Sequence, residues 1–165
     1  MSGEPNSEIL KEIIVRKLGA DEAIPYELLL LADPSMDAIM RYLEDSEIHI
    51  AVWKGKVIGS FVLYPLGGKS FEIKNIAVNE ELQGKGIGKL LLGKASSLAK
   101  EKNAESILIG TSNASIAQLY LYQRCGFEIT GIKQNFFLDN YPEPIFENGI
   151  QCRHMIVLEK KFEGE

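Results

Sequence analysis

Apolar residues along this chain alternate as in strands over some segments and recur at helical spacing over others. In the N-terminal half these patterns predict a strand, two short helices and three further strands. The expected bounds are, in chain order, 13–18, 23–31, 36–43, 47–53, 56–64 and 71–78. Lys54-Gly55 and Gly67-Gly68-Lys69 separate the last three strands, which are therefore expected to pair as an antiparallel meander.

The C-terminal half predicts two longer helices among shorter strands. Apolar residues from Ile87 to Ala99 form the stripe of an amphipathic helix. The segments expected after it are a strand over 106–110, a helix over 115–125 ended by Gly126, a strand over 128–138, an irregular loop over 139–149 and a strand over 152–160. Strand-helix-strand units within this order imply local parallel pairing in an otherwise antiparallel sheet.

Length and composition narrow the class of protein. A chain of 165 residues with 45% apolar and 25% charged residues is typical of one globular domain, residues 1–165, with 1–9 as a flexible leader. No apolar run approaches the ~20 residues of a membrane helix, and the N-terminus lacks a signal-peptide core. We therefore expect a cytoplasmic protein without a membrane partner.

Charge and metal-binding residue types exclude two further classes. The net charge of −5 argues against a nucleic-acid surface, although lysines concentrate between residues 85 and 102. Cys125 and Cys152 have no metal-ligand spacing and are expected to be reduced, partly buried thiols. His49 and His154 are isolated on strands, where a structural role is expected, so no metal site is predicted.

The most informative segment is the loop between the third strand of the meander and the following helix. Gly84, Gly86 and Gly88 remove side chains where a ligand would approach the backbone, and a first helical turn carries unpaired N–H groups. Such a terminus favours anions, above all phosphate, and Lys85 and Lys89 add positive charge. A phosphate-binding loop is predicted, with an ordinary strand-to-helix turn as the alternative.

Two common phosphate loops do not fit this spacing. A Walker loop needs four residues between its first glycine and its Gly-Lys pair and then Ser or Thr. Here three residues separate Gly84 from Gly88, and Leu90 follows Lys89. The dinucleotide fingerprint also fails, because its third glycine would fall on Lys89. Nucleotide hydrolysis and dinucleotide binding both lose support.

The pattern Gln83-x-x-Gly86-x-Gly88 resembles the acetyl-CoA pyrophosphate loop of the GNAT superfamily of N-acetyltransferases. A second block, Tyr122-x-Arg124-x-Gly126-Phe127, is similar to the segment that ends the family's helix after the fifth strand. The family places an Asn at the start of that helix. Asn113 is the candidate, about two residues further from the tyrosine than the family's spacing.

This resemblance extends over residues 13–160 and implies the acyl-CoA N-acyltransferase fold, a mixed α/β (α+β) domain. Its central sheet has about seven strands, flanked by about four helices. Acetyl-CoA is the implied co-substrate. The residues expected to bind it are Ile76, Ala77, Val78, Gln83, Gly84, Lys85, Gly86, Ile87, Gly88, Lys89, Asn113 and Tyr120.

Acyl transfer to an amine needs a base for the amine and an acid for the departing thiolate. Glu72 lies 14 residues before Gly86, the offset at which histone-acetylating members carry their base, although a solvent-facing strand Glu is the common alternative. The resemblance places Tyr122 next to the cofactor sulfur as the acid. Packing on the sheet is the alternative for this tyrosine, and Tyr120 is its substitute. A backbone N–H near Ile76 to Val78 would meet the oxyanion.

No cysteine lies where a covalent acetyl intermediate would form, so direct attack in a ternary complex is expected. The acidic chain, and Asp139, Tyr141, Glu143 and Glu147 in the 139–149 loop, favour a small cationic amine as acceptor. The alternatives are a noncatalytic acyl-CoA-binding sensor, an interaction module, and a protein lysine or N-terminal acetyltransferase. A homodimer through residues 152–160 is a further hypothesis.

Overall fold

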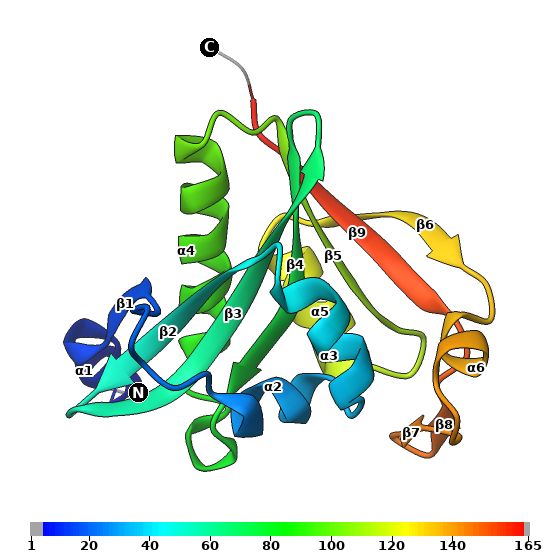
Figure 1. The fold of residues 1–165 in the computed structure, drawn as a ribbon, viewed down its shortest axis with the longest axis horizontal. Helices are drawn as coiled ribbons and strands as arrows, with labels where there is room; N and C mark the ends of the chain where they lie inside the picture. Colours follow the sequence, from blue (N-terminus) through cyan, green and yellow to red (C-terminus); the bar gives the residue numbers. More distant parts are fainter. Residues whose placement is uncertain (1–4, 164–165) are drawn as a thin grey trace. The chain divides into compact units, whose positions relative to one another are not determined.

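The computed structural model describes residues 5–163, and the chain divides into two compact units: Met1–Pro65 with Ile73–Leu98, and Leu66–Glu72 with Ala99–Glu165. Figure 1 shows the elements. Up to the glycine loop they are α1 (Pro5–Glu12), β1 (Ile14–Lys17), α2 (Tyr26–Ala32), α3 (Met36–Leu43), β2 (Glu47–Trp53), β3 (Lys56–Gly67), β4 (Ser70–Val78) and the 3₁₀ turn η1 (Glu80–Leu82). After it come α4 (Ile87–Glu101), β5 (Ser106–Ser112), α5 (Ile116–Arg124), β6 (Glu128–Lys133), α6 (Phe136–Asn140), β7 (Phe146–Glu147), β8 (Ile150–Gln151) and β9 (Met155–Lys161).

The strands of the first unit follow the order β1-β2-β3-β4, as the meander prediction requires. β2 pairs with β3 in antiparallel fashion, and Trp53 lies opposite Lys56. Lys54 and Gly55 have φ angles of 50° and 76°, the left-handed conformation that a type I′ hairpin turn requires at both central positions. Local turn chemistry therefore fixes this register.

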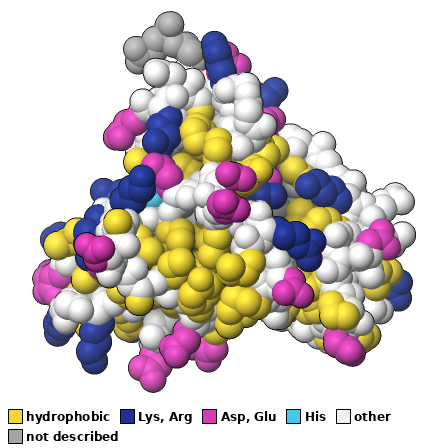
Figure 2. Space-filling model, viewed as in Figure 1, with side chains coloured by type: hydrophobic (Ala, Val, Ile, Leu, Met, Phe, Trp, Pro, Cys, Tyr) yellow, Lys and Arg dark blue, Asp and Glu magenta, His cyan; other side chains and the backbone are white. Residues whose placement is uncertain are grey.

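Helices cover both faces of the first unit's strands. On one face α2 and α3 bury Leu29 and Ile39 against Val62, and the Ser35 hydroxyl accepts the Ala38 N–H at 3.1 Å to cap α3 as expected. On the other face a Cβ built at Gly59 would lie 3.2 Å from the Leu91 side chain, so α4 packs closely on β3 there. Figure 2 shows hydrophobic side chains gathered at the surface around α2, where the exposed large apolar residues of α2 and α3 are Leu30, Leu31, Met36 and Met40.

The strands of the second unit follow the order β5-β9-β6, and both pairings are antiparallel. β9 is paired on both sides, so the hypothesis of a homodimer edge at residues 152–160 is wrong for this strand. β6 has no second strand neighbour among the described residues, and its Ile129 and Ile132 are exposed.

Three predictions about the C-terminal region are corrected. The strand predicted over 128–138 ends at Lys133, because Asn135 adopts a left-handed φ of 58° and α6 begins at the next residue. The segment predicted as an irregular loop contains the end of α6, strand β7 and the turn of the β7–β8 hairpin at Asn148-Gly149, where both residues have positive φ. The last strand begins at Met155, so Cys152 precedes it.

Helix α1 is a further element that the apolar pattern did not predict. It includes residues 5–9 of the predicted leader, and residues 1–4 lie outside the described part of the chain. The Trp53 indole N–H donates to the Glu12 carboxylate at 3.0 Å, which ties the end of this helix to β2. No helix within residues 5–163 is both long enough and apolar enough to cross a bilayer.

Candidate functional site

The glycine loop has the backbone geometry that anion binding requires. Gly84 and Gly86 adopt φ angles of 79° and 88°, which L side chains rarely reach. The Gly86 carbonyl accepts the Leu90 N–H at 3.1 Å, the first hydrogen bond of α4. Gly86 is therefore the helix N-cap, and the N–H groups of residues 87–89 have no acceptor within the helix. They form a donor cluster at the positive end of a 15-residue helix.

Side chains hold this loop to the end of β4. The Gln83 amide donates to the Val78 carbonyl at 3.0 Å, and the Asn79 side chain accepts the Glu81 N–H at 3.0 Å. The Asn79 N–H donates to the Ile58 carbonyl at 2.8 Å. The predicted cofactor residue Gln83 thus has a structural partner, and its hydrogen bond fixes where the loop leaves the strand.

A hollow of about 510 Å³ lies beside the loop within the first unit. Its lining residues are Leu10, Gly86, Lys89, Leu90, Gly93, Lys94 and Ser97. Two of these are exposed lysines of α4: Lys89 lies in its first turn, near the N–H groups at its start, and Lys94 lies about two turns from the start of the helix. An anionic group with an apolar neighbour suits these surroundings.

β4 alternates between buried and half-buried side chains. Ile73, Asn75 and Ala77 are buried, whereas the predicted residues Ile76 and Val78 are half-buried. The Asn75 amide donates to the Leu29 carbonyl at 2.9 Å and to the Tyr42 hydroxyl at 3.0 Å. Sequence reasoning missed this buried amide, which ties the middle of β4 to α2 and α3.

In the second unit the Tyr-x-Arg-x-Gly-Phe motif is a helix C-cap. Gly126 has a φ of 95°, its N–H donates to the Gln123 carbonyl, and the Phe127 N–H donates to the Tyr122 carbonyl at 3.0 Å. These two bonds define a Schellman motif, in which residues C3 and C″ commonly touch. The rings of Tyr122 and Phe127 do so, with centroids 6.3 Å apart. The motif therefore fixes the position of Tyr122.

The two candidate tyrosines have opposite environments. Tyr122 is 5% exposed and Tyr120 is 67% exposed. Burial raises the pKa of the Tyr122 hydroxyl, and the negative charge of Glu147 raises this pKa further. Tyr122 is therefore a protonated phenol over the physiological range, as a proton donor must be.

The Asn113 side chain forms hydrogen bonds with the backbone of residues 151–154. Its side-chain oxygen accepts the N–H groups of Arg153 and His154 at 2.8 and 3.0 Å, and its amide donates to the Gln151 carbonyl at 3.1 Å. These bonds fasten the chain between β8 and β9 to the end of β5. Direct cofactor binding by this side chain remains a prediction, with one amide N–H left to make it.

A cluster of hydroxyl, thiol and carboxyl groups lies around the β7–β8 hairpin. The Ser115 hydroxyl donates to the Glu147 carboxylate at 2.8 Å, and the Ser112 hydroxyl donates to the Cys152 sulfur at 3.1 Å. Burial raises the pKa of the Cys152 thiol, and the Ser112 hydrogen bond partly offsets this. Sequence reasoning placed Glu147 in a loop that would receive a cationic acceptor, with an ordinary solvated linker as the alternative. It did not connect Glu147 to α5, because no local pattern links the two segments.

The predicted residues fall into two sets. The first unit holds Ile76 to Val78 and Gln83 to Lys89 together at the end of β4 and the start of α4. The second unit contains Asn113, Tyr120, Tyr122 and also Glu72, which is half-buried on β4. Within residues 5–163, no three His, Cys, Asp or Glu side chains gather as metal ligands would.

Known proteins resemble this chain over most of its length. Residues 17–127 match the model of the acetyltransferase (GNAT) family. The uncharacterized N-acetyltransferase YvbK of Bacillus subtilis (strain 168) is 53% identical over 134 residues, which cover 81% of this chain and 86% of that protein.

Two solved structures are similar to the chain in both sequence and fold. A GNAT family acetyltransferase from Elizabethkingia anophelis with acetyl-CoA bound is 50% identical, with a TM-score of 0.90 over 92% of this chain and 99% of that one. An IAA acetyltransferase from Bacillus cereus ATCC 14579 is 46% identical, with a TM-score of 0.87 over 91% of this chain and 99% of that one.

Proposed function

Because this chain belongs to the GNAT family of acetyltransferases, we propose that it transfers the acetyl group of acetyl-CoA to the primary amine of a small cationic molecule. Family membership confirms the predicted enzyme class and the mixed α/β fold with a seven-stranded sheet. The identity of the acceptor and direct attack of the amine in a ternary complex are what we propose.

The observation that carries the proposal is the glycine loop between β4 and α4. Its donor N–H groups at residues 87–89, the open backbone at Gly84 and the lysines at 85 and 89 suit the pyrophosphate of acetyl-CoA. A Cβ at Gly84 would meet no atom within 4 Å, so space for a ligand exists beside that backbone. The acetyl-CoA bound in the Elizabethkingia anophelis relative supports the same ligand here.

The acyl-transfer groups follow from the chemistry of a thioester and an amine. A backbone N–H of residues 76–78 stabilises the oxyanion, and the Tyr122 hydroxyl protonates the departing sulfur. The C-cap at the end of α5, which fixes the position of Tyr122, supports this role. The sequence candidate for the base is Glu72, and Tyr120, exposed to solvent, is the weaker candidate for the acid.

The state of the two cysteines supports direct attack by the amine. Cys152 is buried, and its raised thiol pKa makes the nucleophilic thiolate scarce. Cys125 is the C-cap residue of α5 and is half-buried. We therefore expect kinetics of a ternary complex, without an acetylated cysteine.

Charge supports a cationic acceptor. The chain carries a net charge of −5, and Asp139 and Glu143 are exposed near the β7–β8 hairpin in sequence. Because the Bacillus cereus relative is named an IAA acetyltransferase, IAA belongs in any acceptor panel.

Thermal unfolding with about 1 mM acetyl-CoA, CoA or ATP tests the cofactor. A ligand about 100-fold above its dissociation constant stabilises by about 2.7 kcal/mol, so the Tm should rise by several degrees with acetyl-CoA and CoA and not with ATP. Thiol release would then be measured with spermidine, kanamycin, lysine, a peptide with a free N-terminus and IAA. The absence of any Tm shift would contradict the proposal, and release with the peptide alone would reassign the acceptor.

A further inference from the structure

The β7–β8 hairpin fixes a carboxylate that the family motifs in this sequence do not include. Glu147 lies on β7, is half-buried and accepts the Ser115 hydroxyl at 2.8 Å. The next residue, Asn148, donates its amide to the Ala114 carbonyl at 2.9 Å. These bonds join both residues to the start of α5, so the place of the carboxylate is built into the fold of the second unit.

Ser115 and Tyr122 lie on the same face of α5. They are seven residues apart, which is about two helical turns, and their exposed fractions are 3% and 5%. Long side chains on a helix lean toward its N-terminus, so the phenol of Tyr122 extends back toward Ser115. The Glu147 carboxylate, bonded to Ser115, therefore lies at the end of the helix toward which the phenol points.

The electrostatics agree with this geometry. Burial raises the pKa of the Tyr122 hydroxyl, and the charge of Glu147 adds to that increase. The Cys152 thiol responds to Glu147 in the same direction, after the larger effect of its burial and the opposing Ser112 hydrogen bond. A change of charge at Glu147 is thus felt at the Tyr122 oxygen.

We propose that Glu147 and Tyr122 act as one proton-transfer pair, in which Glu147 receives the proton that the amine nitrogen loses and Tyr122 supplies the proton that the sulfur gains. This inference rests on the proposed acetyl transfer. It moves the role of base from Glu72 to a carboxylate coupled to the acid.

Bonds, electrons and protons balance in the proposed acyl transfer. The neutral amine gives its lone pair to the thioester carbon, an N–C bond forms, the C–S bond breaks, and the sulfur keeps the electron pair. The proton on nitrogen passes to the Glu147 carboxylate, and the Tyr122 hydroxyl gives its proton to the sulfur. The Glu147 carboxyl then returns its proton to the Tyr122 oxygen, so one proton has moved from nitrogen to sulfur and no group is oxidised or reduced.

Coupling has a kinetic advantage over two separate groups. A tyrosinate beside an ionised carboxylate is unfavourable, because two like charges would share a partly buried site. Once Glu147 has taken a proton, that repulsion disappears and Tyr122 becomes a stronger acid as the thiolate forms. If the base did not affect Tyr122, removal of the amine proton would not make protonation of the sulfur any easier.

A double-mutant cycle tests this coupling. The variants are Glu147→Gln, which keeps the shape and an acceptor for Ser115, Tyr122→Phe, and the two combined. Glu22→Gln, a hydrogen-bonded carboxylate in the first unit, is the matched control, and Glu72→Gln is measured beside it. Each would be assayed for kcat and for the KM of the amine, with whichever acceptor of the panel above gives the fastest thiol release.

We expect Glu147→Gln and Tyr122→Phe each to lower kcat by about 100-fold or more, as for general acid-base groups, and the combined variant to be little slower than the worse single variant. If the fold-losses of kcat in the two single variants multiply in the combined variant, the two residues act independently and the proposed pair is wrong. A raised KM at unchanged kcat, which is the behaviour of an acceptor anchor, or a loss of kcat in Glu72→Gln alone would also overturn the pair.

Turnover by the wild-type protein distinguishes failure of the proton-transfer pair from failure of the proposed acetyltransferase activity. Wild-type turnover with normal kcat in Glu147→Gln would leave the acetyltransferase proposal intact and overturn the pair. A wild type that binds acetyl-CoA but acetylates none of the amines would overturn both. If Glu147→Gln does not fold, Glu147→Asp replaces it. Aspartate retains the charge on a shorter side chain, so kcat should fall by less than about 100-fold while the coupling to Tyr122→Phe persists.

Discussion

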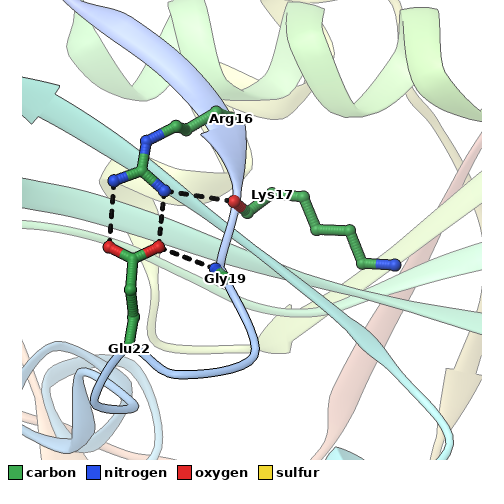
Figure 3. A network of polar contacts seen from close by, with 4 residues as sticks. All are labelled: Arg16, Lys17, Gly19 and Glu22. Carbon is green, nitrogen blue, oxygen red and sulfur yellow. Dashed lines mark hydrogen bonds and ion pairs between the residues drawn. The ribbon is translucent and has the colours of Figure 1, made fainter.

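Glu22 in the first unit and Glu147 in the second are both fixed by short hydrogen bonds, but the charges around them differ. Glu22 accepts from the two terminal nitrogens of Arg16 at 2.6 and 2.9 Å and from the Gly19 N–H at 2.7 Å (Figure 3). Both side chains of that ion pair are exposed, at 45% and 37%. Glu147 accepts instead from the uncharged hydroxyl of Ser115 and is half-buried.

This difference separates a structural carboxylate from one suited to proton transfer. The hydrogen bonds from Arg16 and Gly19 lower the pKa of Glu22 to about 2, which makes it a poor acceptor of protons. Glu147 is held by a neutral hydroxyl rather than by a cation, and its charge raises the pKa of the Tyr122 hydroxyl. The partners of a carboxylate, rather than the number of its hydrogen bonds, indicate which role it has.

The largest effect expected outside the proposed pair comes from the C-cap that fixes the position of Tyr122. Gly126→Ala places a Cβ at a φ of 95°, which costs about 1–2 kcal/mol. That Cβ would lie 3.3 Å from the Lys160 side chain, which can move, so backbone strain is the main term. The free energy of unfolding, measured in urea, should fall by this amount, and kcat should fall with it as Tyr122 shifts.

Gly131→Ala is the matched control for this substitution. Gly131 lies on β6 in the same unit, and a Cβ there would meet nothing within 4 Å. Its stability should change by less than about 0.5 kcal/mol. Equal losses in the two variants would mean that the C-cap has no special role in positioning Tyr122.

A smaller effect is expected from removing the neutral donor of Glu147. Ser115→Ala deletes the hydroxyl that holds the carboxylate and should cost about 1 kcal/mol of stability, the net worth of a typical hydrogen bond. The carboxylate itself remains, so kcat should fall by less than in Glu147→Gln. Ser115→Thr restores the hydroxyl and should recover most of the rate. A rate loss in Ser115→Ala as large as that of Glu147→Gln would mean that the hydroxyl, not the carboxylate, is the essential group.

The parts of the molecule that sequence analysis predicted well are those where a few neighbouring residues decide the conformation. The bounds of α3, the turn at Lys54-Gly55 and the junction of β4, loop and α4 agree with the structure for this reason. The resemblance favoured Tyr122 over Tyr120, and which of the two is buried follows from the phase of α5, which places Tyr122 seven residues after buried Ser115. The role of either tyrosine stays a prediction.

The region after β6 could not be predicted, because its conformation depends on residues distant in sequence. Asn113 fastens residues 151–154, and Ser115 holds Glu147 across 32 positions of sequence. The apolar run at 136–138 has the composition of a strand, yet the left-handed turn at Asn135 starts α6 there. The hairpin that carries Glu147 is thus a product of tertiary contacts, and so is its link to Tyr122.

The smallest expected effect is the pH dependence of the Glu22 ion pair. Because the folded-state pKa of Glu22 is about 2 and the ordinary value is 4.5, the folded state binds fewer protons than the unfolded state between these values. The stabilisation is therefore fully present above about pH 4.5 and is lost as the pH falls through 2. Glu22→Gln removes it at every pH.

Thermal unfolding of the wild type and Glu22→Gln at a series of pH values measures this linkage. Their difference in Tm should be small and constant above pH 4.5 and should shrink toward pH 2. Glu128→Gln, at an exposed position on β6, gives the baseline for removing a surface charge. A difference that grows on acidification would mean that Arg16 does not stabilise the ionised carboxylate. We expect kcat to be unchanged in Glu22→Gln, because the Arg16–Glu22 ion pair contributes to stability and not to turnover. Glu147, in contrast, is proposed to take part in proton transfer.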